Sequence, residues 1–152
     1  MKGDRHNLTG TPITVTENVD EYRRLMREIL KPEDVVLELG SAQGVSASIM
    51  SKYCKEVVGV DKSLLQHAAA VERFPASEYP NLSYVVLDAF DVNAVRKLDK
   101  KFNKIFIDIS GNRCIGDVTE IIDRYEKIFK PELFVVKCFP LKRLINQCTL
   151  YP

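Results

Sequence analysis

The segment "DVVLELGSAQGVSASIM", Asp34 to Met50, decides the fold. It begins with a continuous apolar run at 35–39 that contains a single carboxylate, Glu38. Two glycines, Gly40 and Gly44, follow closely, and the residues after them have helical spacing. A buried strand that passes through a turn with few side chains into a helix is typical of the first half of a βαβ unit.

The same alternation continues on either side of this segment. Apolar runs predict strands at 35–39, 57–60, 82–87, 104–109 and 133–139. Amphipathic spacing predicts helices at 19–30, 43–53, 63–73, 91–99, 117–129 and 141–148. Because the strands do not alternate with polar residues, we expect helices to bury both faces. The sequence therefore predicts an α/β fold, an open, doubly wound, mostly parallel sheet of about five strands.

Length and composition suit one globular domain, with 152 residues, 45% apolar and 28% charged. We assign residues 1–16 to a polar N-terminal arm and residues 17–152 to the single domain. No apolar run approaches the roughly 20 residues of a membrane span, and the N-terminus lacks an apolar signal core. The four cysteines form no C-x-x-C pair, which predicts reduced thiols, no metal site and a cytoplasmic location.

Ligands of such sheets bind at the carboxyl ends of the strands, where the strand order reverses. Four of the five predicted strands end in or beside a carboxylate, and the fifth ends in a lysine. In chain order, these side chains are Glu38, Asp61, Asp88, Asp108 and Lys137. We therefore expect a site in which these four acids lie along one edge of the sheet.

The first two strand ends suggest what the site binds. Gly40 and Gly44 let a ligand approach bare backbone, and the N-terminus of the following helix favours an anionic group. Asp61 follows Gly40 by about 20 residues, a spacing at which an acid accepts hydrogen bonds from ribose hydroxyls. Two alternatives need no ligand: a tight strand-to-helix turn, and Asp61 as a cap of the helix near Ser63.

Four motifs in order resemble those of the class I S-adenosylmethionine-dependent methyltransferases. They are "VVLELGSAQG", "VVGVDKS", "VVLDAFD" and "IFIDIS", and the similarity covers about residues 33–139. The resemblance implies the strand order 3-2-1-4-5 and S-adenosylmethionine as the cofactor. That family usually adds an antiparallel C-terminal hairpin, which the short tail after Phe139 leaves reduced or absent.

The resemblance also implies a role for each motif residue. The glycine-rich turn would hold the methionine part, with Glu38 beside its ammonium, and Asp61 would bind the ribose. Asp88 would contact the adenine amino group. The backbone of Ala89 and the side chains of Lys62 and Phe90 would flank the adenine ring. The turn residues are Gly40, Ser41, Ala42, Gln43 and Gly44.

A nicotinamide-dependent oxidoreductase is the alternative with another cofactor. Such sites use G-x-G-x-x-G, whereas position 42 is alanine here. Glu38 would also repel a pyrophosphate but would attract an ammonium. The sign of the charge therefore favours the zwitterionic sulfonium cofactor.

Asp108 and Lys137 are the candidate catalytic residues. "FIDIS" and "FVVKCF" resemble the Asp and Lys of FtsJ-like and fibrillarin-like RNA ribose methyltransferases, which makes RNA the favoured acceptor. The match is partial, since Arg23 and Arg24 stand where the first FtsJ-like lysine would fall. A lysine base also needs a pKa far below the ordinary value of about 10.4, which a neighbouring aspartate opposes. A structural ion pair, or a lysine that orients the acceptor, is the alternative.

The short C-terminus supports two further predictions. Without the hairpin, the edge of the last strand would be open, and open edges invite pairing, so a homodimer along that edge is expected. The abbreviated end is also compatible with a cofactor-binding module or subunit that performs no catalysis of its own.

Overall fold

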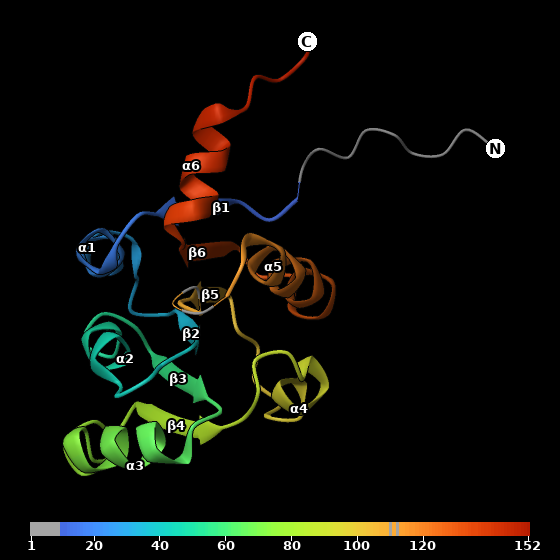
Figure 1. Ribbon diagram of the computed structural model, residues 1–152. Coiled ribbons are helices and arrows are strands. Elements are labelled where there is room, and N and C mark those ends of the chain that lie inside the picture. The colour runs from blue at the N-terminus through green and yellow to red at the C-terminus, as the bar shows by residue number, and fades with distance from the viewer. Residues whose placement is uncertain (1–9, 110, 112) are drawn as a thin grey trace.

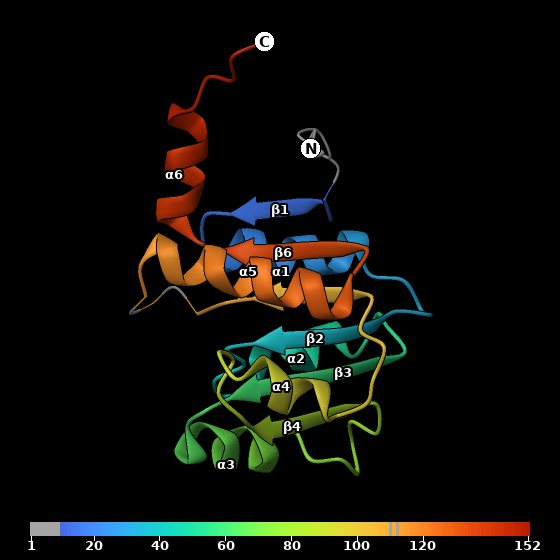
Figure 2. The same cartoon turned by 90° about the vertical axis from the view of Figure 1, so that its right-hand side faces the viewer.

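Six parallel strands form one sheet in the computed structural model, which describes residues 10–109, 111 and 113–152. All the arrows in Figure 2 point the same way. The strands in sheet order are β1 (Ile13–Thr16), β6 (Leu133–Lys137), β5 (Lys104–Ile107), β2 (Val35–Leu39), β3 (Glu56–Asp61) and β4 (Leu82–Val86). The five predicted strands are present in the predicted order, and the order reverses between β2 and β5.

The sixth strand, β1, corrects the prediction of five strands. Residues 13–16 were assigned to the N-terminal arm, but they pair in parallel with β6, with Ile13 opposite Phe134 and Thr16 opposite Lys137. The strand has only four residues, and just Thr16 is buried, so its hydrophobic pattern is too short to identify it. The first nine residues of the predicted arm lie outside the described part of the chain.

The pairing of β1 also corrects the prediction of an open edge beside the last strand. The backbone amide of Phe134 donates to Pro12, and that of Cys138 donates to Thr16. Both sides of β6 are therefore paired, one with β5 and one with β1. The homodimer predicted along that edge loses its structural premise, because the edge strands among the described residues are β1 and β4.

Helices cover both faces of the sheet, as the apolar strands predict. Figure 1 shows α1 (Val19–Ile29), α2 (Val45–Met50) and α3 (Leu64–Arg73) on one face, and α4 (Val92–Arg96) and α5 (Ile115–Phe129) on the other. The last helix, α6 (Phe139–Gln147), begins directly after β6. Val36 belongs to the core under α1 and α2, whereas Leu37 belongs to the core under α4 and α5. Of the helices that the structure describes, none combines the length and apolarity that a membrane span requires.

Candidate functional site

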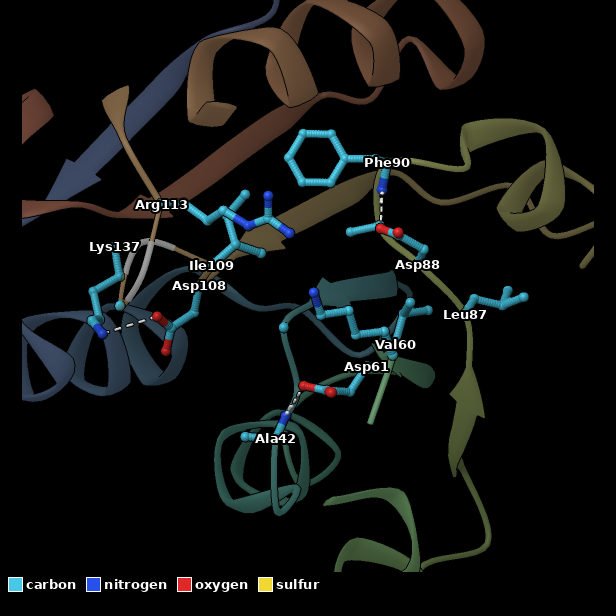
Figure 3. Close-up of a pocket in the computed structure, with 14 residues that line it drawn as sticks. Ala42, Val60, Asp61, Leu87, Asp88, Phe90, Asp108, Ile109, Arg113 and Lys137 are labelled. Atoms are coloured by element: carbon cyan, nitrogen blue, oxygen red, sulfur yellow. Dashed lines mark hydrogen bonds and ion pairs between the residues drawn. The ribbon is translucent and has the colours of Figure 1, made fainter. Parts of the chain in front are cut away.

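Two adjoining hollows lie at the carboxyl ends of the strands, where the strand order reverses. The main cleft, of about 370 Å³, is lined by Gly40, Ala42, Val60, Asp61, Lys62, Leu87, Asp88, Ala89, Phe90, Asp108, Ile109, Gly111, Arg113 and Lys137 (Figure 3). The side pocket, of about 290 Å³, is lined by Arg23, Glu38, Gly40, Ser41, Ala42, Gln43, Val45, Ser46, Gln66 and Asp108. The two hollows share Gly40, Ala42 and Asp108, so one ligand could extend through both.

The turn after β2 has backbone conformations that residues with a side chain rarely adopt. Gly40 and Gly44 have φ values of 84° and 82°, and Ala42 between them has 45°. A Cβ atom on Gly40 would overlap the carbonyl oxygen of Asp108, and one on Gly44 would overlap the hydroxyl of Tyr84. The protein's own packing therefore requires both glycines. Gly44 forms the N-cap of α2 and is not part of the lining of either hollow.

Asp61 fixes the turn to the end of β3. One carboxylate oxygen accepts a hydrogen bond from the backbone N–H of Ala42 at 3.0 Å, and the other accepts from that of Ser63 at 2.9 Å. Ser63 in turn caps α3 through Gln66. Asp61 thus holds local structure and lines the main cleft together with Lys62.

Asp88, Ala89 and Phe90 form the far wall of the main cleft. A carboxylate oxygen of Asp88 accepts a hydrogen bond from the backbone N–H of Phe90 at 2.9 Å. The carbonyl of Ala89 accepts one from the hydroxyl of Tyr125 at 2.7 Å. The guanidinium carbon of Arg113 lies 4.8 Å from the centre of the Phe90 ring, a cation–π contact that the sequence analysis missed.

Asp108 and Lys137 meet at the ends of β5 and β6. The Lys137 amine donates to a carboxylate oxygen of Asp108 at 2.9 Å, and both side chains are about a quarter exposed, at 24% for the lysine and 23% for the aspartate (Figure 3). The structure therefore brings together the two candidate catalytic residues, and it does so as an ion pair.

Glu38 is buried at the base of the side pocket, with a side chain from β2 that reaches towards α1. Only 1% of the residue is exposed. One carboxylate oxygen accepts a hydrogen bond from the Tyr22 hydroxyl at 3.0 Å, and the other has no hydrogen-bond partner among the described residues. Burial, and next the negative charge of Asp108, raise the pKa of Glu38 to about 8, although Tyr22, Arg23 and the nearby backbone N–H of Ala47 act in the opposite direction.

Three polar residues around the side pocket were not predicted as site residues. Tyr22 and Arg23 come from α1 and Gln66 from α3, two helices without a methyltransferase motif in the sequence. The buried side-chain oxygen of Gln66, like one of Glu38, has no hydrogen-bond partner among the described residues. The one signal in the sequence was the arginine pair, Arg23 and Arg24, on a helix that is otherwise apolar on one face.

Comparisons with known proteins identify one similar sequence and several similar folds. No protein-family model matches the chain. A protein-L-isoaspartate O-methyltransferase of Rhodopseudomonas palustris is 32% identical over 94 residues, which are 62% of this chain and 42% of that protein. The chain thus spans less than half the length of this curated relative.

Two solved structures share the fold at low sequence identity. A precorrin 8W decarboxylase of Methanobacterium thermoautotrophicum has a TM-score of 0.66 and 17% identity, and covers 87% of this chain and 69% of its own. The fibrillarin of Aeropyrum pernix, solved with bound S-adenosyl-L-methionine, has a TM-score of 0.59 and 21% identity, over 72% of this chain and 47% of its own.

Together with the strand order, these similarities define the fold. The chain has the fold of the class I S-adenosylmethionine-dependent methyltransferases, as the four sequence motifs predicted.

Proposed function

We propose that the chain is an S-adenosylmethionine-dependent methyltransferase. The observation that carries the proposal is the set of acids at the carboxyl ends of four consecutive sheet positions. Asp61, Asp88 and Asp108 line the main cleft, and Glu38 lines the side pocket that opens from it. This arrangement offers separate acceptors to a ribose, an adenine amino group and an ammonium.

The residues present fit this cofactor. The buried carboxyl of Glu38 suits an ammonium, whose positive charge would lower its raised pKa and favour the carboxylate form, whereas a phosphate would do the opposite, which argues against a dinucleotide. The turn from Gly40 to Gln43 would hold the methionine part, Asp61 the ribose, and Asp88, Ala89, Phe90 and Lys62 the adenine. When bound, S-adenosylmethionine supplies a methyl group on a positively charged sulfur.

Asp108 and Lys137 are proposed to position the methyl acceptor. Both line the main cleft, and Asp108 also lines the side pocket, so a nucleophile held by this pair would lie close to a methyl group at the junction of the two hollows. Holding two reactants in line can contribute roughly 7–11 kcal/mol to the lowering of a reaction barrier. We propose an RNA hydroxyl as the acceptor, on the basis of the Asp–Lys pair. In that role the Lys137 ammonium orients the hydroxyl, and the proton that the hydroxyl loses on methylation goes to Asp108 or to solvent.

Replacing Lys137 with methionine tests this role. We expect methyl transfer to fall by about 10²-fold, the usual cost of misplacing a reactant, with affinity for S-adenosylhomocysteine unchanged within about threefold. Labelled methyl transfer to total RNA, protein and metabolite pools is the measurement. Lys142→Met is the matched control, because Lys142 pairs with Glu21 on the surface at 3.0 Å.

The outcome of this assay also separates the remaining alternatives. Labelling of the protein or metabolite pool in place of RNA would contradict the proposed acceptor. Cofactor binding without labelling of any pool would favour a binding module without catalysis, and binding of NADH alone would favour the oxidoreductase. A cytoplasmic location stays a prediction.

Replacing Asp61 with alanine tests the placement of the ribose. We expect cofactor affinity to fall by about 1.5–3 kcal/mol, the range for hydrogen bonds to a charged group. Isothermal titration calorimetry with S-adenosylhomocysteine measures it. Since Asp61 also bonds the backbone of Ala42 and Ser63, thermal unfolding of the variant must be recorded in parallel. Unchanged affinity in a folded variant would contradict the placement.

A further inference from the structure

A further hollow, which we call the α6 groove, lies beside the main cleft, between the start of α5 and α6. Its volume is about 280 Å³, and its lining residues are Ile115, Phe139, Pro140, Arg143, Leu144 and Gln147. Two segments of the chain lead into it from the main cleft. Arg113 and Lys137 line the cleft, and Ile115 and Phe139, each two residues further on, line the groove. Because two residues span at most about 7 Å, the α6 groove adjoins the end of the cleft where the Asp108–Lys137 pair lies.

The α6 groove exposes large apolar side chains. Phe139 is 53% exposed, although it follows a buried strand closely, and Leu144 is 43% exposed. Figures 1 and 2 both show α6 projecting away from the sheet, and Leu141 is the only buried residue of this helix, all of which the structure describes. An exposed aromatic ring in a groove with polar neighbours is typical of a binding surface.

The charge of the α6 groove favours an anionic partner. Of the described residues that line it, Arg143 is the only charged one. Residues 133–152 contain Lys137, Lys142 and Arg143 and no acid. Lys142 is paired with Glu21, whereas the described part of the chain offers Arg143 no ion-pair partner. The planar guanidinium of an arginine matches the oxygens of a phosphate.

We infer that the α6 groove binds an unpaired nucleotide of a single-stranded RNA, next to the nucleotide that accepts the methyl group. The base stacks on the ring of Phe139, and Arg143 binds the phosphate. Gln147, whose amide is both donor and acceptor, lies where it can bond the edge of the base. This inference rests on the proposed function, since it concerns the same RNA acceptor.

The stacking surface determines which form of RNA is bound. In a duplex, each base face is covered by the neighbouring base, and proteins read such helices by shape and backbone. An aromatic side chain can stack only on a base that is unpaired and splayed out. The α6 groove should therefore select single strands, loops or ends over continuous duplexes.

A single tryptophan in the groove tests this contact directly. The chain contains no tryptophan, so Phe139→Trp introduces one fluorophore and keeps an aromatic face. A mixed-sequence RNA of about ten nucleotides should quench this fluorescence by stacking, in the range of strand lengths that single-strand sites cover. The same strand annealed to its complement should quench much less. Equal quenching by both forms would contradict the preference for unpaired bases.

Replacing Phe139 with alanine tests the contribution of the stack. Affinity of the full chain for the same single strand, measured by fluorescence anisotropy of labelled RNA, should fall by about 5–100-fold, the effect of losing one base–aromatic contact. Ile145→Ala is the matched control, because Ile145 is 50% exposed on α6 but is not part of the groove lining. It should change the affinity by less than about twofold. Thermal unfolding shows whether each variant is folded.

Replacing Arg143 with methionine tests the phosphate contact independently of the stack. The slope of log affinity against log salt concentration should fall in magnitude by about 0.7, the value for one phosphate of a single strand. Phe139→Ala should leave this slope unchanged. Lys142→Met is the control, because Lys142 is paired with Glu21 and is not part of the groove lining. An unchanged slope in Arg143→Met would contradict the phosphate contact.

Three results would overturn the inference, and they are distinguishable. If the parent binds S-adenosylhomocysteine and methylates RNA, but Phe139→Ala binds RNA as well as Ile145→Ala does, the proposed function stands and the role of the α6 groove is wrong. If the parent binds neither form of RNA and methylates another pool, the proposed acceptor is wrong and the inference fails with it. If the parent sediments as a dimer and Phe139→Ala as a monomer with unchanged RNA affinity, the groove is an interface between copies of the chain.

Discussion

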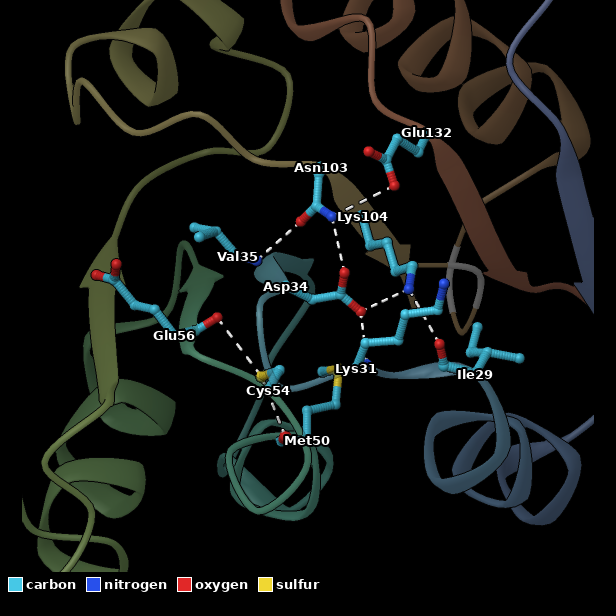
Figure 4. A network of polar contacts seen from close by, with 10 residues as sticks. All are labelled: Ile29, Lys31, Asp34, Val35, Met50, Cys54, Glu56, Asn103, Lys104 and Glu132. Atoms are coloured by element: carbon cyan, nitrogen blue, oxygen red, sulfur yellow. Dashed lines mark hydrogen bonds and ion pairs between the residues drawn. The ribbon is translucent and has the colours of Figure 1, made fainter.

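Replacing Lys104 with alanine should lower the free energy of unfolding by about 3–5 kcal/mol, the usual effect of breaking a buried ion pair. The Lys104 amine donates to a carboxylate oxygen of Asp34 at 2.5 Å and to the carbonyl of Ile29 at 3.0 Å (Figure 4). The two charged side chains are only 8% and 2% exposed. Without the amine, Asp34 would be left as an uncompensated charge in the interior.

The surrounding hydrogen bonds explain why this pair is ionised. Asp34 also accepts from the Asn103 side chain and from the backbone N–H of Lys31, both at 2.8 Å. Burial acts to raise the pKa of Asp34, but the bonds from Lys104, Lys31 and Asn103 outweigh it and lower the pKa. Because the folded-state pKa is lowered, this contribution to stability is present above the unfolded pKa of 3.8 and is lost as the pH falls through the folded value.

Urea unfolding at pH 7 measures the effect of Lys104→Ala. The control is Lys127→Ala, since Lys127 pairs with Asp123 on the surface of α5, where the side chains are 71% and 61% exposed. An exposed pair of this kind contributes about 0–1 kcal/mol. Equal losses in the two variants would contradict the importance of the buried pair. The network lies at the amino ends of β2 and β5, away from the site, so cofactor affinity in folded Lys104→Ala should be unchanged.

Replacing Glu38 with glutamine should weaken cofactor binding and remove a pH dependence from the stability of the protein. Glutamine keeps an oxygen that can accept from Tyr22, but it cannot carry a charge. Affinity for S-adenosylhomocysteine should fall by about 1.5–3 kcal/mol, the range for a hydrogen bond to a charged group. At the same time, the stability of the variant should lose the pH dependence that Glu38 gives the parent.

The direction of that pH dependence follows from the raised pKa. Burial raises the pKa of Glu38 from 4.5 to about 8 in the folded chain. Between these values the folded state holds a proton that the unfolded state has lost, so the parent becomes less stable as the pH rises through this window. The slope corresponds to about 1.4 kcal/mol for each pH unit at full effect.

Urea unfolding between pH 5 and 9, together with calorimetry, measures both effects. Glu28→Gln, on the exposed side of α1, is the control and should change neither the slope nor the affinity. A Glu38→Gln variant that keeps the full slope of the parent would show that another group titrates in this window. A variant that keeps the parent's affinity would contradict the placement of the ammonium.

The sequence was sufficient for the architecture and for the strand-end residues of the site. Continuous apolar runs such as 35–39 and 133–139 indicate burial on both faces, and five parallel strands follow from them. Because the carboxyl ends of parallel strands lie at one edge of the sheet, the sequence alone predicts that the acids lie together there. The same reasoning predicts that Asp108 and Lys137 lie close together, and the Lys137 amine is 2.9 Å from a carboxylate oxygen of Asp108.

Two features could not be predicted from the sequence because they depend on contacts between segments that are far apart in the chain. Strand β1 exists because residues 13–16 pair with β6, about 120 positions later in the chain, and four residues carry too little pattern to show it. Arg23 and Gln66 face the side pocket because α1 and α3 pack on the same side of the sheet. Their own spacing is that of ordinary amphipathic helices.

The sequence by itself determined the order of strands and helices, the parallel sheet and the edge along which its acids lie, because local periodicity and strand direction fix these. Only the tertiary structure decided which groups meet there: the buried oxygen of Glu38, the guanidinium of Arg23 and the ion pair at Asp108. The charge and pKa of a group depend on what packs around it, and that packing comes from parts of the chain that are far apart in sequence.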